Sequence, residues 1–249
     1  MACLHVNRKG FYMKITYIHH SGFLIETEHA LLLFDYAGGT LPELNPDKDL
    51  IVLVSHRHED HFSPEIFNLI QDHPNTRYVI SDDIWQNRVP EDLACRVEFT
   101  DPHDVTKLTD GSGICVTTFR STDEGVAFIV ETEGKTIYHA GDLNDWRWPG
   151  EDRSWNNNMA ANYQRELEKI RDTGFHPDIA MVPLDGRQEE WFCLGMDAFM
   201  RTVGAEQVFP MHFWKDYTVI SRFKELPCSE PYRDRIADIA REGQTFLFL

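Results

Sequence analysis

The residues best suited to chemistry are three histidines and two acids in one short segment, 55–61, which reads Ser-His-Arg-His-Glu-Asp-His. Neutral imidazoles and carboxylates are the ligands that zinc and similar divalent metals prefer. The segment offers more donors than one tetrahedral ion needs: His56, His58, Asp60 and His61. It therefore predicts a metal site with room for two adjacent ions. A solvated polar loop, in which the histidines pair with neighbouring acids, is the alternative.

The elements on either side of this segment are expected to hold it in place. Residues 51–54 are four apolar residues, too short a run for a helix and rich in β-branched side chains, so they predict a buried strand. Ser63 and Pro64 form a typical helix start, which predicts a helix over 64–71. A tight loop between a buried strand and a helix holds its side chains rigidly, as a metal site requires.

Two further candidates follow predicted strands later in the chain. A hairpin over 126–130 and 135–139 leads to Gly141 and Asp142. A carboxylate at such a strand end can lie between two cations and offset their charge. His212 follows a predicted strand over 207–210. Taken alone, each of these two signals is weak.

Together the motifs resemble those of the metallo-β-lactamase superfamily. The segment 55–61 is similar to its His-x-His-x-Asp-His motif, and the resemblance runs over nearly the whole chain from Met13. It is closest to the branch of stand-alone metal-dependent hydrolases that includes the ascorbate-6-phosphate lactonase-like proteins. The resemblance implies an α/β fold, the four-layer αβ/βα sandwich of the superfamily.

The resemblance also implies a set of metal ligands, which are His56, His58, Asp60, His61, Asp142 and His212. His56 and His58 would hold the first ion. Asp60, His61 and His212 would hold the second, and Asp142 would bridge the two sites.

The sequence departs from the family pattern at one expected ligand. The superfamily usually has a further histidine before the hairpin, and Arg120 stands there by spacing. A guanidinium stays protonated and cannot bind a metal. Three outcomes remain open. Asp123 or Glu124 replaces the missing ligand, the first ion binds loosely with extra waters, or Arg120 itself is catalytic and supplies positive charge to a substrate oxygen.

Three other features are expected near the site. His20 is either a residue of the pocket or a turn histidine bonded to the backbone. Asp185, after the predicted strand 178–184, and Asp123 are expected to contact substrate or support a ligand. The loop 144–158 carries three tryptophans and two arginines. It either covers an organic anion or packs on the predicted helix 159–171.

Composition narrows the classes of protein and partner. The chain has 249 residues and a formal charge of −17, and no run of Lys or Arg interrupts this acidity. Nucleic acid and anionic membrane surfaces are therefore not expected as partners. The five cysteines are scattered and form no C-x-x-C pair, as in reduced cytoplasmic proteins. No apolar run has transmembrane length. We expect a cytoplasmic location and leave the oligomeric state open.

The functional prediction is a metal-dependent hydrolase that directs an activated water at a small ester, lactone, amide or phosphodiester. Asp60 would orient the water, and the substrate is expected to be a small anionic molecule. Zinc is the first expectation for the metal, with manganese or iron as alternatives and one or two ions bound. The rival hypothesis is a metal-binding or ligand-sensing protein of the same fold without hydrolytic activity, which Arg120 would favour.

The remaining pattern predicts the rest of the architecture. An antiparallel meander of short strands begins at Ile15, and helices are expected over 195–203, 216–224 and 231–241 before a last strand over 245–249. Residues 1–12 are expected to be a disordered extension of one hydrolase domain over 13–249.

Deleting residues 1–12 should leave stability almost unchanged, because these residues lack a periodic apolar pattern. Thermal unfolding of the truncated chain checks this expectation. A loss of more than about 4 °C, roughly 1–2 kcal/mol for a chain of this size, would show instead that the segment packs on the domain.

Overall fold

The computed structural model describes residues 13–108 and 113–248, and within them the chain forms two β-sheets. The first sheet has seven strands in the order β13-β1-β2-β3-β4-β5-β6. They are β1 (Met13–His19), β2 (Gly22–Glu26), β3 (Ala30–Phe34), β4 (Asp49–Val54), β5 (Arg77–Ser81), β6 (Val97–Thr100) and β13 (Thr245–Phe248). The meander β1-β2-β3 is antiparallel as predicted, whereas β3 to β6 run parallel.

The second sheet has six strands within the same described residues, in the order β12-β11-β10-β9-β8-β7. They are β7 (Val105–Lys107), β8 (Cys115–Arg120), β9 (Val126–Thr132), β10 (Lys135–His139), β11 (Ile179–Pro183) and β12 (Gln207–Met211). The predicted hairpin is β9-β10, and β11 and β12 are parallel to β10.

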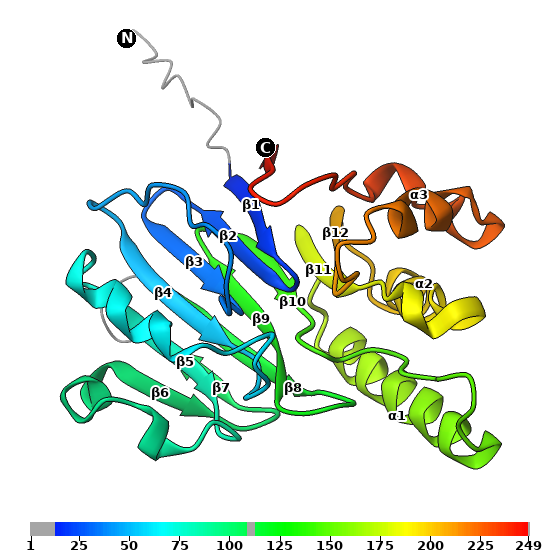
Figure 1. The fold of residues 1–249 in the computed structure, drawn as a ribbon, viewed down its shortest axis with the longest axis horizontal. Coiled ribbons are helices and arrows are strands. Elements are labelled where there is room, and N and C mark those ends of the chain that lie inside the picture. Colours follow the sequence, from blue (N-terminus) through cyan, green and yellow to red (C-terminus); the bar gives the residue numbers. More distant parts are fainter. Residues whose placement is uncertain (1–12, 109–112, 249) are drawn as a thin grey trace, which may run out of the picture.

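The helices lie outside the two sheets (Figure 1). The α-helices are α1 (Arg153–Asp172), α2 (Leu194–Thr202) and α3 (Thr218–Glu225). The short 3-10 helices are η1 (Pro64–Gln71), η2 (Gln86–Arg88), η3 (Glu91–Arg96), η4 (Gly186–Trp191), η5 (Pro227–Ser229) and η6 (Arg233–Arg235). In the described part of the chain, no helix is long and apolar enough to cross a membrane.

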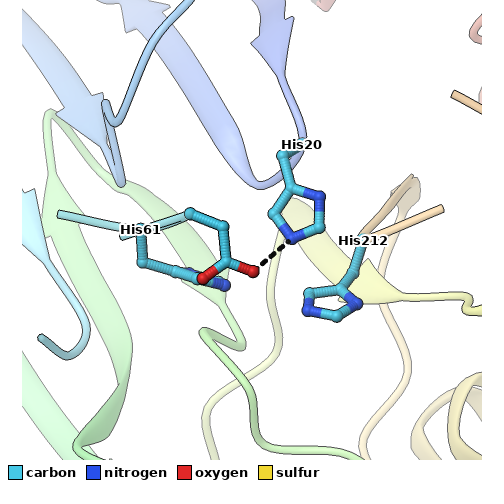
Figure 2. Close-up of side chains that lie close together, drawn as sticks. His20, His61 and His212 are labelled. Carbon is cyan, nitrogen blue, oxygen red and sulfur yellow. Dashed lines mark ion pairs between the residues drawn. The ribbon is translucent and has the colours of Figure 1, made fainter. Parts of the chain in front are cut away.

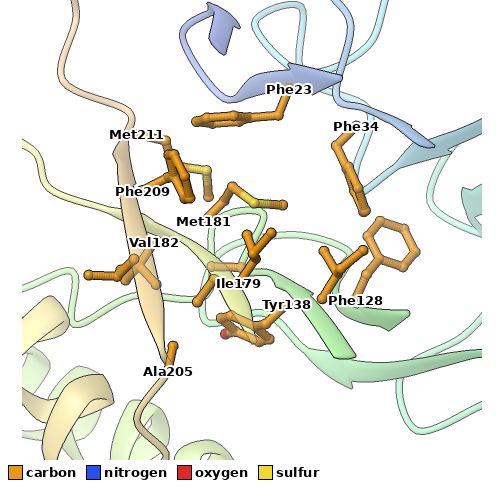
Figure 3. Close-up of a cluster of buried hydrophobic side chains, with 14 of the residues drawn as sticks. Phe23, Phe34, Phe128, Tyr138, Ile179, Met181, Val182, Ala205, Phe209 and Met211 are labelled. Atoms are coloured by element: carbon orange, nitrogen blue, oxygen red, sulfur yellow. The ribbon is translucent and has the colours of Figure 1, made fainter. Parts of the chain in front are cut away.

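Aromatic and aliphatic side chains fill the space between the sheets (Figure 3). Phe34 of β3 meets Phe128 of β9, with 6.5 Å between ring centroids, and Phe23 of β2 meets Phe209 of β12 at 6.2 Å. All four rings are almost completely buried. Burial of this apolar surface is the main force that joins the two sheets.

A helical layer covers each outer face, which confirms the predicted α/β sandwich. On the second sheet, Tyr138 of β10 stacks on Phe199 of α2 at 4.8 Å between ring centroids. On the first sheet, Ile66 and Phe67 of η1 are buried in a hydrophobic cluster with apolar side chains of that sheet. The layer on the first sheet is 3-10 rather than α-helical.

The predicted start of the helix over 64–71 is confirmed, because the Ser63 side chain accepts a hydrogen bond from the Glu65 backbone and Pro64 begins the helix. The predicted helix over 231–241 is wrong. The Ala237 N–H donates to the Val208 carbonyl at the edge of the second sheet instead. The predicted extension, residues 1–12, lies outside the described residues.

The histidine segment after β4 and the loop between β8 and β9 meet where the two sheets pack closely. The Val126 N–H donates to the Ser55 carbonyl at 2.9 Å. Gly125 has φ +65°, and a Cβ there would lie 2.0 Å from the Ser55 oxygen and 2.6 Å from the His56 Cβ. Only glycine fits this contact, which sets the loop 121–125 against the histidine segment.

The Gly125→Ala substitution should lower the free energy of unfolding by about 3 kcal/mol, the sum of a left-handed backbone penalty and a steric clash. The matched control is Gly174→Ala, where φ is +80° but no atom lies within 4 Å of the added Cβ. That variant should lose only about 1 kcal/mol. Chemical denaturation of both proteins compares them, and equal losses would show that the loop contact adjusts freely.

Candidate metal centre

Two adjacent clusters of imidazoles and carboxylates lie at these loop ends. The first contains His56, His58, Asp123 and Asp142. The second contains His20, Asp60, His61 and His212. Within each cluster, one potential ligand atom from every residue lies within 4.8 Å of the others. All six ligands expected from the sequence are therefore brought together, and His20 and Asp123 join them.

Asp142 lies between the two clusters. Its Oδ2 is 3.6 Å from Nε2 of His56 in the first cluster. Its Oδ1 is 3.3 Å from Nε2 of His61 and 3.5 Å from Nε2 of His212 in the second. One carboxylate thus presents a different oxygen to each group of imidazoles, as a bridging ligand would.

The second cluster gathers side chains from three distant segments (Figure 2). His20 comes from the turn after β1, His61 from the loop after β4, and His212 from the end of β12. Nε2 of His20 is 3.2 Å from Oδ2 of Asp60. Left-handed backbone angles at His20 and His212, φ 50° and 62°, turn these side chains toward the centre. Such strain in non-glycine residues is typical of functional sites.

The first cluster is more open to solvent. His56 is completely buried, whereas the side chains of His58 and Asp123 are 42% and 46% exposed. Oδ2 of Asp123 is 3.6 Å from Nδ1 of His58. Glu124 is also near His58, but the Arg57 guanidinium binds its other oxygen. Of the two replacement carboxylates left open by the sequence, the geometry favours Asp123.

Hydrogen bonds to Nδ1 orient three of the imidazoles. Ser55 Oγ lies 3.0 Å from Nδ1 of His56, and an oxygen of Asp185 lies 3.0 Å from Nδ1 of His212. Nδ1 of His61 is 2.8 Å from Oδ2 of Asp35. These partners leave Nε2 of each ring facing the cluster, the arrangement that fixes ring orientation at metal sites. Asp185 therefore contacts the candidate ligand His212.

Sequence reasoning missed Asp35, whose carboxylate hydrogen-bonds to Ser55 and His61 of the histidine segment. Its two oxygens accept hydrogen bonds from the Ser55 N–H at 2.7 Å and the Ser55 hydroxyl at 2.6 Å. Burial raises the pKa of Asp35, but the neighbouring His139 and His61 outweigh it and leave the pKa at about 2. The available signal was position, because Asp35 ends a buried strand just as Asp142 does.

The clusters leave several buried polar atoms without a hydrogen-bond partner: Nε2 of His56 and His61, and Oδ1 of Asp142. Burying such atoms unpaired is costly, and folded proteins rarely tolerate it. These atoms belong to the two clusters, in each of which the potential ligand atoms lie within 4.8 Å of one another. A divalent cation in each cluster would satisfy them, so the residues present fit a pair of metal ions.

The protonation states of the clustered side chains also suit the binding of metal ions. Burial lowers the pKa of His56 to about 3 and that of His20 to about 4, so both rings are neutral and able to ligate at neutral pH. Burial also lowers the pKa of His61, but Asp142 and Asp35 outweigh it and raise the value to about 9. Burial raises the pKa of Asp142, yet three facing imidazoles hold it below its usual range. The surroundings of His61 therefore favour positive charge.

The structure does not bring Arg120 to either cluster. It ends β8 with its side chain exposed and its N–H donating to Glu166 Oε1 at 2.9 Å. It lines a separate cavity together with Arg165 and Lys169. The sequence interpretation placed Arg120 correctly along the chain but not in space, because the following loop turns back and presents Asp123 instead.

A cavity of about 440 Å³ opens beside the clusters. Asp60, Asp123, Asp142 and His212 form its polar floor. The remaining lining residues are Trp146, Trp148, Glu151, Trp155, Met159, Arg187 and Trp214. The predicted loop after Asp142 thus borders the site, although α1 already begins at Arg153 within it. Arg187 and Trp214 were not predicted, and no local motif marks them.

Comparison with known proteins agrees with this geometry. A family model described as a beta-lactamase superfamily domain matches residues 14–147, more than half of the chain. A UPF0173 metal-dependent hydrolase of Methanosarcina barkeri is 32% identical over 52% of this chain and 61% of its own length. A protein of the same name from Methanosphaerula palustris is 27% identical over 81% of this chain and 84% of its own length.

Among solved structures, the chain is similar to Igni18, a metallo hydrolase from the archaeon Ignicoccus hospitalis. The TM-score is 0.68, with 19% identity over 96% of this chain and 99% of that one. At this identity the likeness establishes the fold, which is the metallo-β-lactamase fold.

If Asp123 completes the first cluster, Asp123→Ala should lower the bound metal from about two ions per chain to about one, because a three-donor site loses affinity. Arg120→Ala is the matched control and should retain both ions, since its side chain lies elsewhere. Elemental analysis of protein dialysed against dilute zinc measures both. Loss of an ion in the Arg120 variant, with none in the Asp123 variant, would reverse the assignment.

Proposed function

The chain belongs to the β-lactamase superfamily and is a metal-dependent hydrolase of the metallo-β-lactamase fold, and we propose that its paired clusters cleave a small organic substrate with water. The single observation that carries the proposal is the position of Asp142. It faces the imidazoles of both clusters with separate oxygens, in a buried region where several donor atoms lack partners.

In this proposal His56, His58 and Asp123 would hold one ion and His20, Asp60, His61 and His212 would hold the other, with Asp142 available to both. When bound, such ions supply Lewis acidity and a water of lowered pKa. The mixed nitrogen and oxygen donors suit zinc, which we propose as the metal, and also accept manganese or iron.

The chain's own residues position the reactants. Asp60 lies at the cavity floor with its carboxylate 30% exposed, so it can accept a hydrogen bond from an attacking water and orient it. Asp123 borders the same floor from the opposite cluster. Asp35 and Asp185 keep two imidazoles aligned through Nδ1, which preserves the direction of Nε2 in His61 and His212.

The substrate proposed is a small ester, lactone, amide or phosphodiester. The resemblance to the ascorbate-6-phosphate lactonase-like branch supports a lactone within this group. Negative charge that the substrate carries or develops would lie at the floor, where bound cations stabilise it. The cavity volume, about 440 Å³, suits a small molecule. We also propose a cytoplasmic location, which the free thiols of the four cysteines in the described residues support.

The rival hypothesis, a binding or sensing protein without hydrolysis, loses its main support in the structure. That hypothesis depended on Arg120 occupying a ligand position. Arg120 instead lines another cavity, and Asp123 lies among the potential donors of the first cluster. This placement supports hydrolysis over the rival hypothesis.

Activity should depend on added metal and on the ligands. Protein stripped with a chelator and reloaded with zinc, manganese or iron should hydrolyse at least one substrate in a panel of esters, lactones, amides and phosphodiesters. His61→Ala and Asp142→Ala should reduce turnover at least about a hundredfold, because each removes a ligand.

His176→Ala is the matched control, since this exposed histidine pairs with Glu206 away from both clusters, and it should retain full activity. Metal-independent turnover that persists in both ligand variants would contradict the proposal.

A further inference from the structure

The walls of the cavity beside the metal centre are unusually rich in indole rings. Four of the chain's six tryptophans line it: Trp146, Trp148, Trp155 and Trp214. Trp146 and Trp148 lie between β10 and α1, Trp155 lies in the first turn of α1, and Trp214 follows β12. Two distant parts of the chain thus contribute the same kind of side chain to one cavity.

Two of these rings are left facing solvent. Trp155 is 39% exposed and Trp214 is 48% exposed, although most large apolar residues of the described chain are buried. Exposed apolar surface grouped around a concave site is typical of ligand binding. The exposed part of the Trp155 ring, and the part of the Trp214 ring that Arg187 and His20 leave uncovered, are therefore available to a substrate that enters the cavity.

Hydrogen bonds and ring stacking fix the loop that carries Trp146 and Trp148. Trp146 Nε1 donates to the Asp142 carbonyl at 2.7 Å, and its ring stacks on Trp148 with 3° between planes. The buried Asn156 accepts from the Trp148 N–H and donates to the Trp148 carbonyl. Gln188 donates to two carbonyls of the same loop. A wall ordered before binding costs little entropy when a ligand docks.

The charged side chains in the cavity walls do not favour a substrate ring that carries an acidic group. Arg187 is the one cation among the described lining residues, and both oxygens of Asp185 bind its guanidinium. The same guanidinium lies over Trp148 and Trp214, 5.6 and 4.6 Å from their ring centroids. Its charge is thus already paired, and Glu151 adds a negative charge to the lining. Among the described wall residues, the charges therefore offer little to neutralise a carboxylate or phosphate on the ring.

We propose that the substrate of this hydrolase carries an aromatic ring, without an acidic group of its own, that lies against the tryptophan walls. The inference rests on the proposed function, because it assumes that the scissile group lies at the metal-binding floor. Floor and walls border the same cavity, so a short link joins the ring to the scissile group. Offset or edge-to-face contact with indoles favours an aromatic ring over an aliphatic group of similar size.

The test measures binding of three phosphonates to zinc-loaded protein by calorimetry. Benzylphosphonate, cyclohexylmethylphosphonate and ethylphosphonate share one head group for the metal centre and differ only in the group offered to the walls. Benzylphosphonate should bind at least about tenfold tighter than ethylphosphonate and about threefold tighter than the cyclohexyl compound. Trp155→Ala should remove most of the benzyl advantage while leaving ethylphosphonate affinity unchanged.

Trp85→Ala is the matched control, because this tryptophan is 67% exposed and lies outside the cavity, and it should keep the full benzyl advantage. Equal affinities for the three phosphonates would overturn the aromatic inference while leaving the metal centre intact. Failure of all three to bind zinc-loaded protein would overturn the proposed function, and the inference with it.

Discussion

The buried carboxylate of Asp142, facing imidazoles from two clusters, is the constraint on which the rest of this structure depends. A carboxylate and several unpaired nitrogens are expensive to bury without a compensating charge. Neighbouring side chains stabilise this arrangement through hydrogen bonds. Asp35, Ser55 and Asp185 bind the outward nitrogens, so the inward ones cannot rotate away. Divalent cations would satisfy the atoms that remain unpaired.

Holding such a site requires a rigid frame, and the two packed sheets supply it. The ligand-bearing loops leave strands that are almost wholly buried, and Gly125 lets the loop of Asp123 touch the backbone of Ser55. Left-handed backbone angles at His20 and His212 are stable because the surrounding strands enforce them. This backbone strain is local, and the favourable packing of the sandwich core offsets its energetic cost.

Asp185 links the metal centre to the cavity wall. One of its oxygens lies 3.0 Å from His212, and both bind the guanidinium of Arg187, which rests over Trp148 and Trp214. The position of a ligand and the shape of the aromatic wall therefore share one carboxylate. A polar floor for the reaction and an apolar wall for the substrate are parts of a single connected network.

The sequence by itself determined the ligands that stand close together or directly after buried strands. His56, His58, Asp60 and His61 occupy one loop, and Asp142 and His212 end strands whose apolar runs are visible locally. The tertiary structure alone decided the rest. It selected Asp123 over Arg120 because the loop after β8 folds back onto Ser55. It placed His20, which the sequence left open as a pocket residue or a turn histidine, in the second cluster, and it added Asp35 through contacts between segments distant along the chain. It also replaced the helix expected over 231–241 with pairing to β12. The local sequence pattern indicates which side chains lie at the end of a strand. Which of these side chains come together depends on packing between distant segments, and the order of residues along the chain does not reveal that packing.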